Sequence, residues 1–456
     1  MHKTKRPYQL PEPLTCDLGE VADGVSVELA EEYIRRHASR MPRYVYLENL
    51  YKGFHDVFKQ PEKEHWKPDN RLAVNFPRYI TDTFTGYGYG VPIRETSPDD
   101  AVNEAVAEFC RDNEITDHEV EMVKKCCVYG HAWEYLYQNG ESRTKVAAVA
   151  PSRLFAVYDD TVEGHALFAV RYDFHSADSD RPGEIYGEIL TPAAIEPFDG
   201  GRKVPAQAVE NPYGRIPCVE WRLNDERMGL YEPVAGLIES YNHAIGEKAN
   251  DVDAFAEAYL AVLGAELEED GVRRIRDRRL INLYGTDDAK DVIVQFLTKP
   301  TADATQENLL TRLERLIYQT SMVANISDET FGSAASGVAL AYKLQAMSNL
   351  ALTFDRKIEK SLRKRYKLFC SLSTNVANPD AWRDMEFKMA RNLPRNIQEE
   401  TAVAAQAEGL VSKRTQLELL SYVPDPAVEL ERMEKEEAAG AESAVDRRMF
   451  STEGAE

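Results

Sequence analysis

Histidine and cysteine are the residue types most often used to bind metals or to act as nucleophiles, and the chain contains nine and six of them. The histidines show no metal-ligand spacing, and the cysteines form no C-x-x-C motif. Cys126 and Cys127 are adjacent within an apolar helical pattern. The sequence therefore predicts reduced, buried thiols, with no disulfide framework and no metal site.

Motifs for phosphate binding and hydrolysis are also missing. There is no G-x-x-x-x-G-K-[ST], H-E-x-x-H or G-x-S-x-G. The GYGYG segment, Gly86–Gly90, follows a predicted helix and runs into Pro92, so we interpret it as a turn and not as a dinucleotide site. Among 77 acidic residues, carboxylate pairs arise by chance. We expect no catalytic residue and no cofactor, although an enzyme site assembled from distant residues stays open.

Two basic clusters stand out because the formal net charge is −22, which disfavours a repressor-like grip on DNA. The first consists of Arg273, Arg274, Arg276, Arg278 and Arg279, and the second spans Arg356–Lys367. Each could contact nucleic acid or an acidic partner. Each could equally form ordinary ion pairs with neighbouring acidic residues.

A run of small residues separates two predicted long helices. It follows Phe331 and consists of Gly332, Ser333, Ala334, Ala335, Ser336 and Gly337. Without side-chain bulk, the backbone can bend and approach other surfaces closely. The run predicts a hinge or flexible loop, because a simple helix-to-helix turn would not need so many small residues.

The elements that would position these residues follow from hydrophobic spacing. Helices are predicted over 26–51, over 72–86, and as a pair over 98–127 with Asp99 and Asp117 as N-caps. Short aromatic and branched runs over 131–221 predict antiparallel strands. Three long helices are predicted over 231–262, 306–323 and 338–370, with strand-like runs between the first two. The first of these carries an acidic face made of Glu239, Glu247, Asp251, Asp253 and Glu257.

The composition, 43% hydrophobic and 29% charged over 456 residues, predicts a soluble protein with more than one core. No run approaches the roughly 18 apolar residues of a membrane span. The basic, Pro-rich N-terminus lacks an apolar segment, so we expect no secretory signal and a cytoplasmic site of work. The segment Asp425–Glu456 is acidic, and its last part is predicted to be disordered.

Seven segments, in this order along the chain, carry a resemblance to a known family. They are LENLYKGFH, KPDNRLAVNFPRYITDTFTGYGYGVPI, CVYGHAWEYLY, GRIPCVEWRLND, YEPVAGLIESYNHAIGEKANDVDAF, NISDETFGSAASGVALAYKLQAM and YVPDPAVELERMEKEE. In these segments the chain resembles the portal proteins of tailed bacteriophages, in the long-tailed, siphovirus-type branch. The resemblance runs from about Tyr44 to Glu437.

The resemblance implies an α+β, mainly helical portal fold that assembles as a ring, usually of twelve subunits. It implies a wing over 1–225, a stem helix over 226–263, a clip over 264–303, a second stem helix over 304–325 and a tunnel loop over 326–337. A long wing helix and return strand would occupy 338–395, and a helical crown with a disordered acidic tail 396–456. Ser327, Phe331 and the small residues to Gly337 would form the tunnel loop, and the five clustered arginines would dock partners at the clip.

The resemblance also implies a function. The ring would form the channel for double-stranded DNA at a capsid vertex of the virion, after assembly in the host cytoplasm, and would serve packaging, head–tail connection and ejection. Its partners would be the terminase large subunit, a head-completion adaptor, and the major capsid and scaffolding proteins, with no membrane. Acidic stem faces would keep DNA from adhering to the wall. The uncharged loop favours sensing or sealing around DNA over gripping. The alternatives are the enzyme above and a capsid-associated adaptor or scaffold protein that forms no tunnel.

Overall fold

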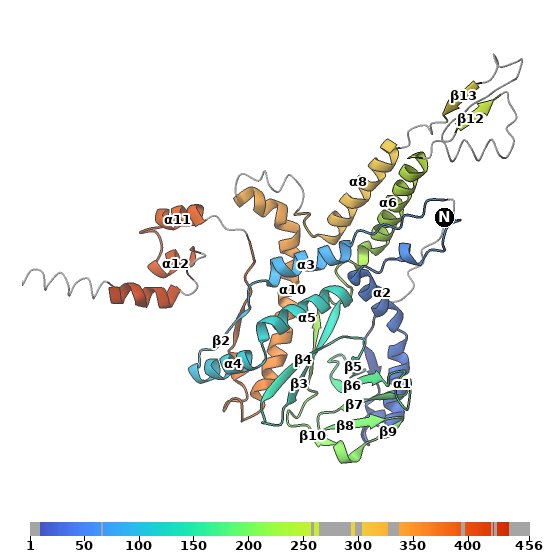
Figure 1. The fold of residues 1–456 in the computed structure, drawn as a ribbon. Helices are drawn as coiled ribbons and strands as arrows, with labels where there is room; N and C mark the ends of the chain where they lie inside the picture. Colours follow the sequence, from blue (N-terminus) through green and yellow to red (C-terminus); the bar gives the residue numbers. More distant parts are fainter. Residues whose placement is uncertain are drawn as a thin grey trace, which may run out of the picture. The chain divides into compact units, whose positions relative to one another are not determined.

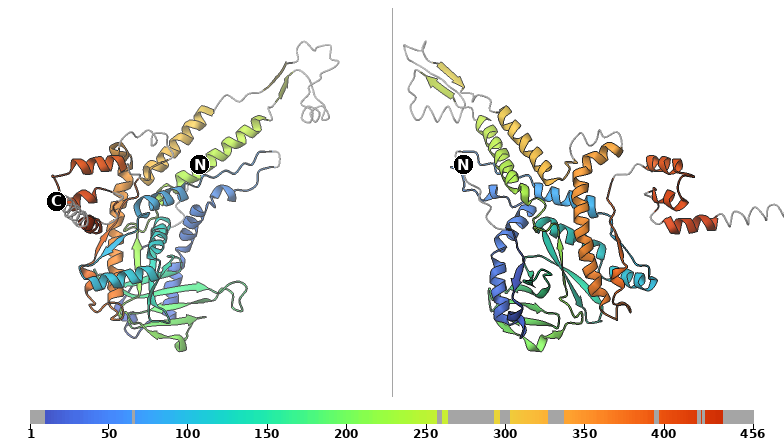
Figure 2. Two further views of the ribbon diagram at one scale, coloured as in Figure 1. Left: turned by 60° about the vertical axis from the view of Figure 1, so that its left-hand side comes forward. Right: turned by 180° about the vertical axis from the view of Figure 1, so that it is seen from behind.

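The computed structural model describes residues 10–64, 67–256, 260–263, 293–296, 303–326, 337–393, 397–420, 423 and 426–436. The chain divides into two compact units, one of residues 1–329 and 342–391 and the other of residues 330–341 and 392–456. Figures 1 and 2 show the ribbon from three directions. Ser327–Ser336 of the predicted tunnel loop and the predicted clip arginines lie outside the described residues.

Helices predominate among the described elements, which confirms the predicted α+β, mainly helical class. The α-helices are α1 (Val27–Ala38), α2 (Met41–Lys52), α3 (Phe76–Tyr89), α4 (Asp100–Asp112), α5 (Ile115–Tyr129), α6 (Ala235–Ala256), α8 (Asp303–Ser321), α10 (Gly337–Cys370), α11 (Ile397–Gln406) and α12 (Lys413–Glu418). Residues 426–436 are also helical.

The strands are concentrated between α5 and α6. They are β1 (Leu14–Cys16), β2 (Arg94–Thr96), β3 (His131–Gln138), β4 (Thr144–Val149), β5 (Leu154–Asp159), β6 (Ala166–Phe174), β7 (Ile185–Leu190), β8 (Ala194–Asp199), β9 (Arg202–Lys203), β10 (Val209–Glu210), β11 (Cys218–Arg222), β12 (Leu260–Leu263), β13 (Ile293–Phe296) and β14 (Glu386–Lys388). The predicted antiparallel strands over 131–221 are confirmed. The N-terminal β1 joins their sheet in parallel with β5.

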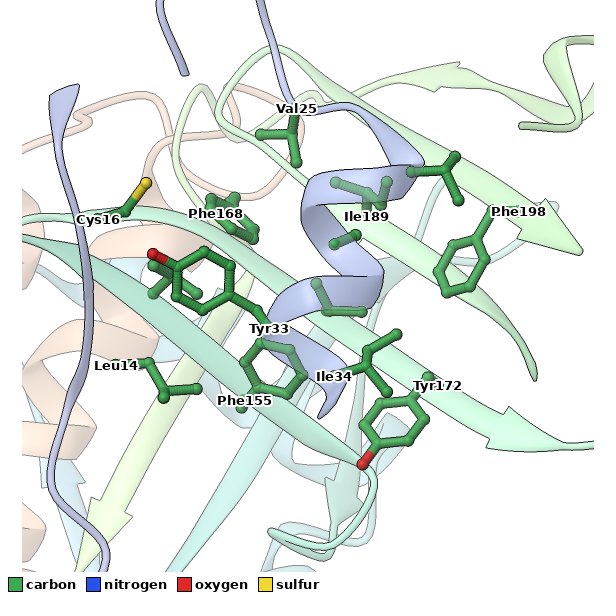
Figure 3. Packing of buried hydrophobic residues seen from close by; sticks show 14 residues of the cluster. Leu14, Cys16, Val25, Tyr33, Ile34, Phe155, Phe168, Tyr172, Ile189 and Phe198 are labelled. Carbon is green, nitrogen blue, oxygen red and sulfur yellow. The ribbon is translucent and has the colours of Figure 1, made fainter. Parts of the chain in front are cut away.

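The largest sheet has the order β1-β5-β6-β7-β8-β10, with β9 paired to β8, and it is covered on both faces. Successive side chains of a strand point to opposite faces. Phe155 and Val157 accordingly pack against Tyr33 and Ile34 of α1, as Figure 3 shows for Phe155. Their neighbours Leu154 and Ala156 pack in a separate cluster with Trp133 of β3. The smaller sheet, β11-β3-β4, therefore contributes to the core on the face opposite α1.

A tight turn at Gly130 connects α5 directly to β3. Gly130 has φ 86°, and a Cβ atom there would lie 2.0 Å from the carbonyl oxygen of Arg227. Any other residue would therefore need a strained backbone and a displaced neighbouring segment. This turn places Glu119 of α5 and Glu134 of β3 close together, so that both carboxylates contact Arg365 of α10.

The long helix α10 packs against α3 and α4. Phe354 lies 6.3 Å from Phe84 and 5.3 Å from Tyr89 between ring centroids. Farther along α10, Tyr366 and Phe369 share a core cluster with Phe109 of α4. The predicted apolar stripe of this helix is buried from Leu344 to Phe369, and only Leu340 is half-buried.

Three local predictions were wrong. The helix predicted over 26–51 is two helices, interrupted at Ser39 and Arg40. The predicted turn at Gly86–Gly90 is helical through Tyr89, because Tyr87 and Tyr89 are buried and their packing outweighs the roughly 1 kcal/mol helix penalty of each glycine. Asp99 caps α4 as predicted, but Asp117 lies inside α5, whose N-cap position is held by Glu114.

The predicted state of the cysteines is confirmed, since all six are free thiols and four of them are buried. Within the described ranges, no helix is both long and apolar enough to cross a membrane.

Candidate functional site

The predicted functional residues are attached to three long helices, α6, α8 and α10. Gly337 is the first residue of α10 and is the one predicted tunnel-loop residue within the described structure. The five clip arginines lie in the part of the chain between β12 and β13, outside the described residues. The structure can therefore define how the helices that carry these segments are held.

Helices α6 and α8 lie side by side, as Figures 1 and 2 show from every direction. The helix predicted over 231–262 is shorter than expected, because α6 ends at Ala256 and Leu260–Leu263 form strand β12, paired antiparallel with β13. The second helix was predicted over 306–323 and spans Asp303–Ser321. Between the helices, Gln306 donates a hydrogen bond to Asp251 over 2.9 Å, and Lys248 pairs with Glu307.

The acidic face predicted on α6 is occupied by the chain itself. His55 lies 3.0 Å from Glu239, whose second oxygen accepts from the backbone N–H of Asp56. Lys63 pairs with Glu247 over 2.8 Å. The side-chain amide of Asn70 donates to Asp253. With Asp251 bonded to α8, four of the five predicted acidic residues have intrachain partners, and Glu257 lies outside the described residues.

These contacts define a strap, residues 55–64 and 67–74, that runs along α6. The backbone of the strap also bonds to α6. The N–H of Asn70 donates to the side chain of Asn250 over 2.6 Å, and the N–H of Val74 donates to the side chain of Asn242 over 2.8 Å. Asn242 and Asn250 are both buried. Gly246 brings the strap close, because a Cβ there would lie 3.0 Å from the carbonyl oxygen of Asn70. The acidic face of α6 is therefore partly covered by the segment predicted as a loop, in which Lys63 brings a cation to Glu247 and the backbone and Asn70 bring neutral N–H donors.

The solvent-facing side of α8 has a different character. Asn308, Arg312, Arg315 and Gln319 are exposed and recur at helical spacing along one stripe. Within the described residues, neither arginine makes a hydrogen bond or ion pair. The two helices therefore present a partly neutralised surface with two available cations, and not a uniformly negative one.

The base of α6 is fixed by buried ion pairs. Arg43 of α2 forms a two-pronged pair with Glu232, at 2.9 and 2.5 Å, just before the helix begins. The same guanidinium donates to the backbone oxygen of Arg227 over 2.8 Å. The side chain of Arg227 in turn pairs with Glu220 of β11 over 2.6 Å. Bidentate pairs of this kind fix orientation as well as position.

Glu220 also accepts from His131, which lies 3.0 Å away and is itself 3.0 Å from the hydroxyl of Tyr44. Burial would raise the pKa of Glu220, but the hydrogen bond from His131 and the charge of Arg227 hold it well below its usual range. Burial lowers the pKa of His131 to about 4, against the opposing effect of Glu220. The carboxylate is therefore charged and the imidazole neutral at physiological pH.

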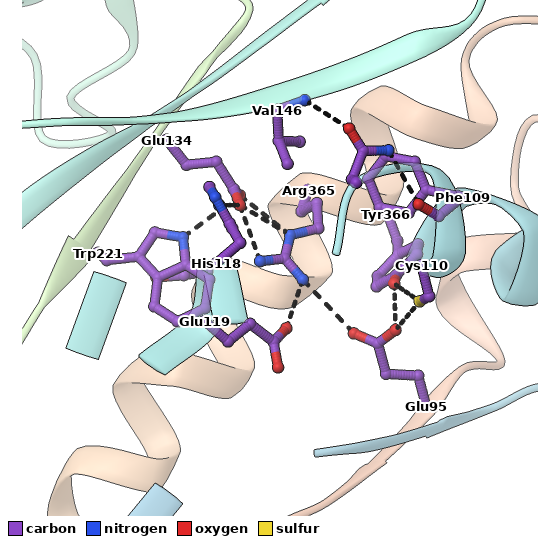
Figure 4. A network of polar contacts seen from close by, with 12 residues as sticks. Glu95, Phe109, Cys110, His118, Glu119, Glu134, Val146, Trp221, Arg365 and Tyr366 are labelled. Carbon is purple, nitrogen blue, oxygen red and sulfur yellow. Dashed lines mark hydrogen bonds and ion pairs between the residues drawn. The ribbon is translucent and has the colours of Figure 1, made fainter. Parts of the chain in front are cut away.

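A second buried network holds α10, and Figure 4 shows its centre, Arg365. This guanidinium is 0% exposed. It bonds Glu134 of β3 through two nitrogens, at 3.0 and 2.7 Å, and Glu119 of α5 over 2.6 Å. Glu95 of β2 lies 3.5 Å away, and its other oxygen accepts from the hydroxyl of Tyr366. Arg365 also stacks over the ring of Trp221 at 5.2 Å.

One cation cannot neutralise three buried carboxylates, and their pKa values divide accordingly. Burial opposes ionisation of Glu134, but the charge of Arg365 and the hydrogen bond from His118 lower its pKa to about 2. Burial raises the pKa of Glu119 to about 8 and also raises that of Glu95. Glu134 is thus the ionised partner of Arg365, and Glu119 is mostly protonated near neutral pH.

These two networks fix the positions of α6 and α10, so their role is to hold the helices in place. Across the described ranges, no group of three or more His, Cys, Asp or Glu residues is arranged to hold a metal ion. The networks were not predicted, although Arg365 carried a signal: it lies seven residues after Ile358, on the apolar stripe of α10. An arginine at a core position of a helix indicates a buried carboxylate partner.

The sequence matches the family described as phage portal protein, SPP1 Gp6-like, over residues 30–443. A relative, the portal protein of Bacillus phage SPP1, is 23% identical over 412 residues, which cover 86% of this chain and 80% of the relative.

Solved structures similar to the chain come from gene transfer agent (GTA) particles. The neck of the native particle, computed with C12 symmetry, gives a TM-score of 0.45 at 13% identity, covering 76% of this chain and 88% of that one. The neck of the empty particle, computed with C6 symmetry, gives 0.43 at 11% identity, covering 76% and 90%. These TM-scores are too low to support a conclusion, so the assignment rests on the sequence match.

Proposed function

The chain belongs to the SPP1 Gp6-like family of phage portal proteins, and we propose that it assembles into a ring, of twelve copies, whose channel conducts double-stranded DNA at one capsid vertex. The observation that carries this proposal is the family match, which extends over residues 30–443 and so includes α2 to α12 entirely and all of α1 except its first three residues. The ring would serve genome packaging, head–tail connection and ejection.

We assign the regions of the chain to parts of such a ring. Residues 1–225 would form the wing, α6 and α8 the stem, and residues 264–303 the clip. Residues 326–337 would form the tunnel loop, α10 and β14 the wing helix and return strand, and residues 396–456 the crown. The paired arrangement of α6 and α8, with β12 just before the proposed clip paired to β13 within it, supports the stem assignment.

The buried networks suggest how such a ring could carry load. Force on a translocating DNA would act on the tunnel loop and on the stem. Arg43 and Glu232 tie the start of α6 to α2, and Arg365 ties α10 to β3 and α5. Buried charged pairs of this kind resist separation, because breaking one leaves an uncompensated charge. A loop at the start of α10 could then move while the middle of the helix stays fixed.

The surface charges refine the proposed channel wall. DNA slides when it is not held, and a wall rich in free cations would hold it. The acidic residues of α6 have their own partners, so repulsion from this helix is weaker than its composition indicates. The exposed Arg312 and Arg315 of α8 offer a small number of weak phosphate contacts if that face lines the channel.

The proposed partners are the terminase large subunit, a head-completion adaptor, and the major capsid and scaffolding proteins. The five arginines from Arg273 to Arg279 would serve docking at the clip. The protein would have no catalytic activity of its own and would reside at the portal vertex of the virion, after assembly in the host cytoplasm.

Native mass spectrometry and negative-stain microscopy of the full chain test the proposal. We expect a closed ring, either alone or after addition of the scaffolding and capsid proteins. A monomer or dimer under all these conditions would instead favour an adaptor or scaffold role. Robust nuclease or nucleotide-hydrolysis turnover by the purified chain would contradict the proposed absence of catalysis.

A further inference from the structure

A basic recess lies where α10 passes β11. It is lined by Glu220, Arg222, Asp225, Lys357, Lys360, Ser361 and Lys364. Ser361 fixes the helix against the strand by donating to the backbone oxygen of Glu220 over 3.1 Å. The buried bonds of Arg365, one residue beyond Lys364, set the rotation of α10 about its axis. Buried contacts of α10 therefore fix the part of the helix that carries Lys360 and Lys364.

The positive charge in the recess is only partly compensated. Arg222 pairs with Glu220 over 2.5 Å, and Lys357 pairs with Asp225 over 2.5 Å. Lys360 and Lys364 are exposed and make no hydrogen bond or ion pair with any described residue. Burial of its stem, followed by the charges of Arg222 and Lys360, lowers the pKa of Lys364. The recess therefore holds two cations beyond those that the chain neutralises.

The excess continues along the helix. Lys367 is one further turn along α10, and its pKa is lowered by burial and then by the charges of Arg215 and Arg383. Lys360, Lys364 and Lys367 are spaced by four and three residues, so they share one face. On a chain with a net charge of −22, this basic face is complementary in charge to the acidic surface of a second copy.

We propose that Lys360 and Lys364 take a surface carboxylate from a second copy of this chain, and so form an ion pair between neighbouring subunits of the ring. The inference rests on the proposed ring. Charge complementarity supports the choice of occupant, because another copy is the acidic surface present at the highest local concentration. In a closed ring the same small gain is repeated at every interface.

Zero-length carbodiimide cross-linking tests this contact, because it joins only amines and carboxylates in direct contact. Rings would be assembled from an equal mixture of unlabelled and 15N-labelled chains, cross-linked and analysed by mass spectrometry. We expect links from Lys360 or Lys364 to a carboxylate, with mixed-isotope pairs showing that the link joins two copies. The Lys357–Asp225 pair provides an internal control, since its link should form within one chain. Rings that give this control link but no intersubunit link to Lys360 or Lys364 would overturn the proposal.

Charge reversal gives a second readout. The variant Lys360→Glu/Lys364→Glu should raise the chain concentration needed for half-maximal ring assembly by about fivefold or more, as expected for the loss of weak ion pairs. The matched control is Lys413→Glu/Arg414→Glu on α12, which changes the net charge equally at exposed positions and should assemble like the wild type. Circular dichroism of both variants would check that the fold is retained.

The outcomes separate the contact from the ring itself. If the wild type forms no ring under any condition, the proposed function fails. If the wild type and the Lys360→Glu/Lys364→Glu variant form rings equally well, the ring stands and the contact is wrong. Normal rings of that variant that retain or package less DNA would assign the recess to DNA phosphates and also overturn the proposal.

Discussion

Substitution of Arg365 by methionine should cause a large loss of stability. Methionine keeps a long apolar stem but removes the cation that Glu134 and Glu119 share. Breaking a buried pair by removing one partner costs about 3–5 kcal/mol, because the remaining charge is stranded. Lost stacking over Trp221 adds roughly 1 kcal/mol. We therefore expect the free energy of unfolding to fall by about 4–6 kcal/mol and Tm to fall by on the order of 10 °C.

The matched control lies two residues earlier on the same helix. Arg363 pairs with Glu359 at 2.8 Å, but both side chains are about two-fifths exposed, at 36% and 44%. A surface pair of this type contributes roughly 0.5 kcal/mol. Arg363 also lies 5.5 Å from the centre of the Phe387 ring, a contact worth about 0.5–1 kcal/mol at an exposed site, so Arg363→Met should lower Tm by no more than about 3 °C. Urea and thermal unfolding of the unassembled chain can be followed by tryptophan fluorescence, since the buried Trp221 lies directly under Arg365.

A double variant separates the stranded charge from lost packing. In Glu134→Gln/Arg365→Met the carboxylate with the lowest pKa of the cluster is gone, so less charge remains buried without a partner. We expect the double variant to be more stable than Arg365→Met alone. Costs that simply add, or an Arg365→Met variant as stable as Arg363→Met, would show that the network does not hold α10.

Three further predictions concern pH, the loop and the clip. Because the pKa of Glu119 is about 8 in the folded chain and near 4.5 when unfolded, its contribution to stability should fall as pH rises from about 4.5 to about 8; Glu119→Gln should flatten the decline in Tm between about pH 5 and 8, and an unchanged slope would contradict the assignment. Gly337→Val should leave the fold intact but impair DNA packaging in an infectivity or in vitro packaging assay; normal packaging would make the loop a mere connector. Charge reversal across Arg273–Arg279 should weaken docking of tail-side partners more than ring assembly, measured by pull-down against native mass spectrometry; unchanged head completion would refute it.

Periodicity predicted the elements in which one face is buried. The apolar stripe of α10 was found residue by residue because every turn contributes to the same core, and the predicted helix over 338–370 differs from α10 by one residue. The strands over 131–221 were found because branched and aromatic residues alternate around turn residues. These signals are local, so a single sequence displays them.

Prediction failed where tertiary contacts decide. Ser39 and Arg40 interrupt a pattern that is helical on both sides, because the chain must turn there to pack α1 on the sheet and α2 near α5. The glycines of GYGYG remain helical because the intervening tyrosines are buried. The bonds between the strap and α6 link residues about 180 positions apart, as for Asn70 and Asn250. No spacing in the sequence indicates such pairs.

Net charge was a poor predictor of how strongly the α6 surface would repel DNA. Composition counts every carboxylate equally, but a carboxylate acts on DNA only to the extent that its charge is not compensated nearby. Lys63 of the strap compensates the charge of Glu247, and the strap donates neutral hydrogen bonds to Glu239 and Asp253, whereas Arg312 and Arg315 have no such partner among the described residues. Removing the strap's contact should therefore expose charge: Lys63→Ala leaves Glu247 free and should make the α6 surface more repulsive to DNA than the wild type. A stronger salt dependence of DNA passage in that variant would support this reasoning, and an unchanged one would show that this face of α6 does not meet DNA.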